Sequence, residues 1–146
     1  MPSRTRSNID EGAIMNPRRK VAPTLRILCA EDDEELLACT AQLLHDQGHA
    51  VDCATDGQQA LEVLLNDCDA FDLLITDRQM PHLDGVALVE ESRRAGYRGK
   101  IIVFATALSE LDRERFGDLA VNAIVEKASR EESLLEAVQK VAAAVA

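Results

Sequence analysis

Two stretches that end in carboxylates decide the fold: ILCAEDD at residues 27–33 and FDLLITD at residues 71–77. Each is an apolar run of strand length, and the second is almost wholly apolar, as expected for a strand buried on both faces of a sheet. If both are parallel strands of one open sheet, Glu31, Asp32 and Asp77 meet at its carboxyl edge, where ligands of such sheets bind. The pattern therefore predicts an acidic pocket.

Apolar runs alternate with amphipathic segments along the rest of the chain. This alternation predicts an α/β domain with a doubly wound, five-stranded parallel sheet and helices on both faces. Gly48 stands where the first helix should end, as glycine often does. The predicted strands are 26–30, 50–54, 71–76, 100–105 and 123–125, and the predicted helices are 34–47, 57–66, 86–95, 110–119 and 131–144.

Crowded carboxylates repel one another or hold protons unless a cation neutralises them. Ligands that are all oxygen favour a hard cation, above all Mg²⁺. The alternative for residues 31–33 alone is that such residues only cap the following helix. Two more apolar runs end in polar residues that would face the same pocket, which favours the metal site over a simple helix cap. Thr106 follows IIVFA, and Lys127 follows AIVE.

A hydroxyl and an ammonium group opposite a carboxylate and a metal suit a tetrahedral dianion better than another carboxylate. The pocket is thus predicted to bind a phosphoryl group. Asp77 is the natural nucleophile, because a carboxylate can attack phosphorus and form an acyl phosphate. Mg²⁺ and Lys127 would spread the charge of the transferring group.

Residues 26–141 resemble the receiver domain (CheY-like) of two-component response regulators, whose fold is flavodoxin-like. The resemblance rests on the order of the acidic pair, Asp77, Thr106 and Lys127 at successive strand ends, and on DRQMPHLDG at residues 77–85. It implies phosphorylation of Asp77 by a sensor histidine kinase or a histidine phosphotransfer protein. Such a protein is a phosphorelay signalling module and catalyses only its own phosphorylation and dephosphorylation.

The resemblance also implies a role for each site residue. Asp32 would be a direct Mg²⁺ ligand, Glu31 would act mostly through water, and the backbone carbonyl of Gln79 would complete the protein ligands together with Asp77. Thr106 and Lys127 would bind phosphoryl oxygens.

The chain departs from the family pattern at two positions. Ala128 follows Lys127 where the family usually has proline with a cis bond, so we expect either a trans bond with a shifted loop or a strained cis bond. Ile124 stands where the family commonly has Tyr or Phe. The signal must therefore travel another way, and the weakly apolar 110–119 helix, with Gly117 inside it, is the expected route.

Composition adds several expectations. The net charge of -10 conceals a basic amino-terminal segment, because the first 25 residues hold five basic and two acidic residues and the remainder has a net charge of -13. Residues 1–24 are predicted to be a disordered tail and 25–146 one receiver domain. The acidic body disfavours direct binding of nucleic acid.

The apolar runs are too short to span a bilayer, so no membrane contact and a cytoplasmic location are expected. The cysteines are read as small core residues: Cys29, Cys39, Cys53 and Cys68.

Output is expected through partner docking by a stand-alone receiver, because the last predicted helix reaches the end of the sequence. The docking face would combine the 110–119 helix, the 123–125 strand and the 131–144 helix. Two alternatives remain: a receiver excised from a longer hybrid kinase or regulator, and a phosphorylation-independent binding module. The residues expected to build the face are Leu111, Phe116, Ile124 and Leu135.

Overall fold

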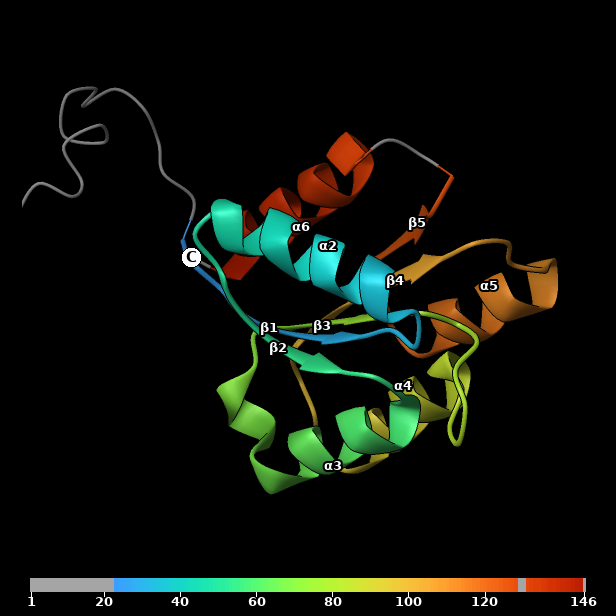
Figure 1. Cartoon of the computed structure of the whole chain (residues 1–146). Coiled ribbons are helices and arrows are strands. Elements are labelled where there is room, and N and C mark those ends of the chain that lie inside the picture. The colour runs from blue at the N-terminus through green and yellow to red at the C-terminus, as the bar shows by residue number, and fades with distance from the viewer. Residues whose placement is uncertain (1–22, 129–130, 146) are drawn as a thin grey trace, which may run out of the picture.

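The computed structural model describes residues 23–128 and 131–145, so most of the predicted basic tail lies outside the described residues. Five parallel strands form one sheet in the order β2-β1-β3-β4-β5, which confirms the predicted fold class (Figure 1). The chain moves outward from β1 to β2 and then returns to β3 on the other side of β1. This reversal opens a crevice at the carboxyl ends of β1 and β3. The strands are β1 (Arg26–Ala30), β2 (Ala50–Ala54), β3 (Leu73–Thr76), β4 (Lys100–Ala105) and β5 (Ala123–Glu126).

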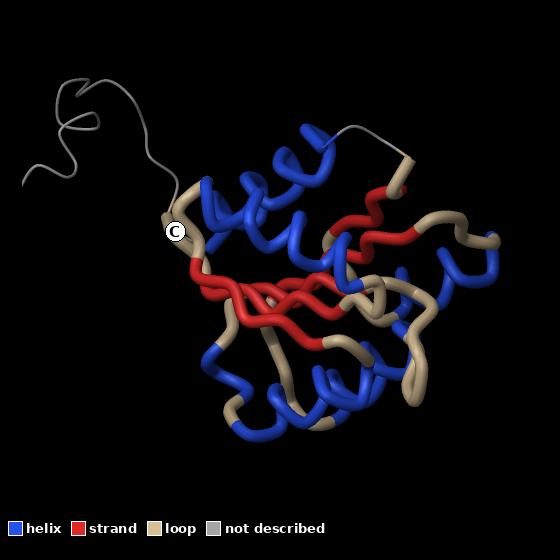
Figure 2. Tube along the Cα trace, viewed as in Figure 1, coloured by secondary structure: helices blue, strands red, loops and turns tan. Residues whose placement is uncertain are grey.

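Helices cover both faces of this sheet, as the tube view also shows (Figure 2). One face packs against α2 and α6, with Leu37, Leu44 and Val138 in its core. The other face packs against α3, α4 and α5. The helices are α2 (Glu34–Asp46), α3 (Gly57–Asn66), α4 (Gly85–Arg94), α5 (Glu110–Asp118) and α6 (Glu131–Val145), and a 3₁₀ turn, η1, spans Cys68–Ala70.

Side-chain caps fix where the helices begin. Asp33 accepts a hydrogen bond from the Leu36 amide at the start of α2, and Asp84 accepts one from Ala87 at the start of α4. Both caps lie at the carboxyl edge of the sheet, so they hold the two loops that border the predicted site. Gly48 follows α2 with a φ of 96°, in the left-handed region that glycine favours, as predicted.

Three expectations need correction. The third strand begins at Leu73 instead of residue 71, because η1, capped by Asp67, brings the chain into the sheet two residues later. Cys39 and Cys53 are exposed and are not core residues, since Cys53 lies on the edge strand β2. Phe116, a residue of α5, is fully buried in the core and cannot contribute to a docking surface.

Cys29 lies in the core, Cys68 is partly buried against it, and all four thiols are free. Within the described residues, no helix is long and apolar enough to cross a membrane.

Candidate functional site

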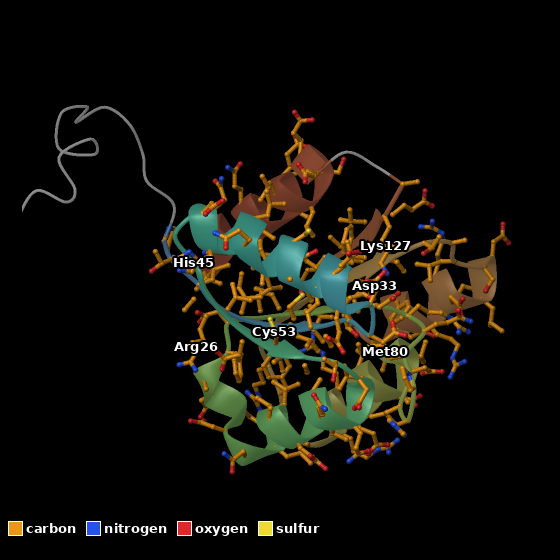
Figure 3. The ribbon with its side chains drawn as sticks, viewed as in Figure 1. Arg26, Asp33, His45, Cys53, Met80 and Lys127 are labelled. Atoms are coloured by element: carbon orange, nitrogen blue, oxygen red, sulfur yellow. The ribbon has the colours of Figure 1, made fainter. Side chains whose placement is uncertain are left out.

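The carboxyl edge of the sheet gathers the predicted acidic residues. Glu31 and Asp32 follow β1, and Asp77 follows β3, so oxygen atoms of the three carboxylates lie within 4.8 Å of one another. Glu31 and Asp77 are buried, whereas Asp32 is exposed. Figure 3 shows Lys127, Asp33 and Met80 at this end of the sheet and Arg26 and His45 at the other end.

Lys127 lies between two of these carboxylates. Its Nζ atom is 2.7 Å from Glu31 Oε1 and 2.7 Å from Asp77 Oδ2. The Lys127 amide donates a hydrogen bond to the Ala105 carbonyl at 2.7 Å, which continues the pairing of β4 and β5 past the end of the sheet. The Lys127–Ala128 bond is trans. Lys127 therefore reaches Asp77 with a trans bond to Ala128 after it.

Burial and pairing act in opposite directions on these groups. Burial raises the pKa of Glu31, although its hydrogen bonds with Lys127 and the Asp33 amide oppose the shift. Burial also lowers the pKa of Lys127, but its hydrogen bonds with Asp77 and Glu31 outweigh this effect and leave the pKa raised. Lys127 is therefore held as an ammonium ion.

The charge of this site suits a divalent cation. Three carboxylates face one ammonium group, which leaves a formal charge of about -2 if all three are ionised. Glu31 has both oxygens engaged, because Oε1 contacts Lys127 and Oε2 accepts the Asp33 amide at 3.1 Å. Asp32 is the exposed member and so the more available ligand. These oxygen donors fit Mg²⁺.

The loop after Asp77 forms the other wall of the site. Gln79 lines an open cavity of about 380 Å³ together with Asp32 and Arg78. A Cβ atom added at Gly85 would overlap the Asp77 carbonyl, so the loop returns very close to the strand end. Thr106 directly follows β4 at the same edge and is exposed, with its neighbour Ala105 buried. The structure thus brings Glu31, Asp32, Asp77 and Lys127 into one cluster and puts Gln79 and Thr106 at its border.

An ion pair that was not predicted from the sequence lies beside the site. Arg78 donates two hydrogen bonds to Asp112 on α5, from Nε at 3.0 Å and from Nη2 at 3.2 Å. A local signal did exist, because Ser109 and Asp112 form a capping box that is visible as Ser-Glu-Leu-Asp. Arg78, the partner of Asp112, is 34 residues away, and no local sequence pattern indicates that the two residues pair.

The fold agrees with what comparisons with known proteins show. The model of the response regulator receiver domain family matches residues 27–139, so the chain belongs to this family. The curated transcriptional regulatory protein DltR of Streptococcus agalactiae is 29% identical over 111 residues, which are 76% of this chain and 49% of that protein. CpxR of Escherichia coli is 36% identical over 88 residues, or 60% of this chain and 36% of that protein.

The chain spans about half or less of the length of these curated relatives. Among solved structures, the chemotaxis protein CheY4 of Vibrio cholerae has a TM-score of 0.73 at 24% identity. The matched region is 82% of this chain and 99% of the CheY4 chain. That likeness shows the fold. The match to the family model identifies the chain as a receiver domain, a signalling module homologous to the receiver domains of response regulators.

Proposed function

We propose that the chain accepts a phosphoryl group on Asp77 in a two-component phosphorelay. The observation that carries the proposal is the position of Lys127, whose Nζ atom bridges Glu31 and the proposed acceptor while Asp32 stands exposed beside them. A buried acceptor carboxylate next to an ammonium ion and an oxygen-rich cation site has the parts that phosphoryl transfer needs.

In the transfer step, one Asp77 carboxylate oxygen attacks the phosphorus of a phosphohistidine in the donor. The new O–P bond forms as the P–N bond breaks, and the released imidazole takes up a proton. Lys127 and Thr106 bind phosphoryl oxygens. Hydrolysis of the acyl phosphate by water returns the carboxylate and inorganic phosphate.

A bound Mg²⁺ ion would supply positive charge to the phosphoryl oxygens. Asp32 and Asp77 would hold it directly, Glu31 mostly through water, and the Gln79 carbonyl would complete the protein ligands. The phosphoryl group adds about -1.5 to -2 charges to an acidic site, so its stability depends on these cations.

The proposed donors are a sensor histidine kinase or a histidine phosphotransfer protein, and the proposed location is the cytoplasm, where ATP supplies such donors. The proposed output is docking of a protein partner on α5, β5 and α6, without direct contact to nucleic acid. A groove of about 670 Å³ on this face, lined by residues of β5 and α6 and by Arg113, supports this choice. We assign residues 25–146 to the receiver.

Incubation with acetyl phosphate and Mg²⁺, followed by intact-mass measurement, tests the proposal. The wild-type chain should gain one phosphoryl group, and the gain should disappear with EDTA. Asp77→Asn should gain none, whereas Asp69→Asn, in an exposed turn away from the site, should behave as the wild type does. Phosphorylation of the Asp77→Asn protein in Mg²⁺ would contradict the assignment.

A further inference from the structure

The ion pair between Arg78 and Asp112 joins the residue after the proposed acceptor to the beginning of α5. It is bidentate, and its side chains are 28% and 10% exposed. The guanidinium hydrogen bonds hold the pKa of the Asp112 carboxyl below its usual range. A forked, partly buried pair of this kind is stronger than a surface ion pair.

Asp112 also belongs to the capping box that starts α5. Its Oδ2 atom accepts both the Ser109 amide at 3.3 Å and Arg78 Nε at 3.0 Å. The Ser109 hydroxyl in turn accepts the Asp112 amide at 3.0 Å. Arg78 is therefore connected through Asp112 and Ser109 to the loop between β4 and α5. This loop carries Thr106, three residues before the cap.

The helix α5 has few other attachments to the body. Of its nine residues, Asp112 and Phe116 are buried, while Leu111 is 62% exposed. At its other end, Arg93 donates hydrogen bonds to the carbonyls of Leu119 and Ala120. Because the apolar contact of α5 is small, the hydrogen bonds of Arg78 and Arg93 add to what holds the helix, and the loss of either should loosen it.

Arg78 is also close to the place where the phosphoryl group would form. Its amide donates a 2.6 Å hydrogen bond to Asp77 Oδ1, and the residue lines the 380 Å³ cavity that Asp32 and Gln79 share. A phosphoryl dianion carries about twice the charge of the Asp112 carboxylate and offers three acceptor oxygens. It can therefore compete with Asp112 for the guanidinium group.

We propose that Arg78 couples the phosphorylation of Asp77 to α5 by exchanging Asp112 for the phosphoryl group. In the unphosphorylated chain Arg78 holds Asp112 and the capping box. In the phosphorylated chain the guanidinium turns to the phosphoryl oxygens, and the first turn of α5 loosens together with Leu111. This inference rests on the proposed function, and it supplies a route for the signal where Ile124 stands in place of an aromatic residue. Arg78 is a positioning residue in this account.

Amide hydrogen exchange with and without acetyl phosphate and Mg²⁺ tests this coupling when intact mass is followed in the same samples. In the wild-type chain, exchange over residues 109–119 should rise several-fold on phosphorylation. In Arg78→Gln and in Asp112→Asn it should be fast in both states, with phosphorylation still detected by mass. The Asp112→Asn change keeps a side-chain oxygen for the cap, so it removes mainly the ion pair.

The matched control is Arg94→Gln, which removes an exposed ion pair with Glu91 within α4 and should leave the phosphorylation response of α5 intact. A purely structural role for Arg78 would change the basal exchange but preserve the response. A phosphorylated Arg78→Gln protein whose α5 still responds as the wild type does would overturn the inference. A chain that gains no phosphoryl group would instead refute the proposed function, and the inference with it.

Discussion

The Nζ atom of Lys127 lies 2.7 Å from Oε1 of Glu31, a side chain that is only 5% exposed. Lys127 is thus the resident cation of two buried carboxylates, because it contacts Asp77 as well. A metal ion bound at this cluster would share Glu31 and Asp77 with the ammonium group. Binding of Mg²⁺ at this cluster would therefore be linked to the stability of the fold.

The first prediction concerns Lys127→Met. This change leaves two buried carboxylates without their ammonium partner, so the free energy of unfolding without metal should fall by about 1–3 kcal/mol. Mg²⁺ should recover much of the loss, since it can replace the missing charge. Urea unfolding with and without Mg²⁺ measures both effects. Lys140→Met, at an exposed position of α6, is the control and should change little; an equal loss there would argue against the assigned role of Lys127.

The second prediction ranks the proposed metal ligands. Asp32 is exposed, whereas both oxygens of Glu31 already have partners in Lys127 and the Asp33 amide. Asp32→Asn should therefore weaken Mg²⁺ binding more than Glu31→Gln does, by about tenfold or more for a directly bound carboxylate. Calorimetric titration of Mg²⁺ into each variant gives the comparison. Equal weakening by the two changes, or greater weakening by Glu31→Gln, contradicts this order.

The strand ends could be predicted from the sequence because parallel topology alone brings them to one edge. The order of the apolar runs was enough to predict that three carboxylates meet at this edge, and they do cluster there: Glu31, Asp32 and Asp77. The Arg78–Asp112 pair could not be predicted in this way. It depends on the direction of a long side chain toward a helix 34 residues away, and no local pattern encodes that direction.

Errors arose where burial depends on packing between elements. The neighbours of Phe116 in the sequence are mostly charged, which favoured an exposed position. Phe116 is the largest apolar side chain of α5, however, and it is fully buried beneath that helix. Cys53 lies in an apolar run, but β2 is an edge strand, which leaves part of one face uncovered.

The third prediction concerns pH and His49. This side chain is buried, its Nδ1 accepts the Leu25 amide at 3.0 Å, and burial lowers its pKa. The folded chain therefore favours the neutral imidazole. The resulting stability is fully present above the usual histidine pKa of about 6.5, and it is lost as the pH falls below that value, because the unfolded chain takes up the proton more readily.

Urea unfolding of the wild type and of His49→Asn between about pH 7.5 and pH 5.5 tests this linkage. The wild type should lose more stability over the interval than the variant, which cannot take up a proton. His45→Asn, at an exposed position near the end of α2, serves as the control. Parallel pH profiles for the wild type and His49→Asn would show that His49 does not contribute.

The fourth prediction concerns Gly85, the first residue of α4. A Cβ atom there would overlap the Asp77 carbonyl and approach Arg78 Cα to 2.9 Å, and both are backbone atoms that cannot move independently of the site. Gly85→Ala should lower the free energy of unfolding by about 1–3 kcal/mol and slow phosphorylation of Asp77. Unfolding curves and the rate of mass gain report the two effects. Unchanged values for both would mean that the loop accommodates the methyl group.

The fifth prediction uses Gly117, which lies inside α5 with no neighbouring atom within 4 Å of an added Cβ. Gly117→Ala should raise the free energy of unfolding by about 0.5–1 kcal/mol, because alanine favours the helix and the methyl group meets no obstacle. If α5 loosens when Asp77 is phosphorylated, a more stable α5 should resist the change. The rise in amide exchange over residues 109–119 should then be smaller in this variant than in the wild type, at equal phosphorylation by mass. A variant that is more stable but shows the full rise would mean that the order of α5 is not what phosphorylation controls.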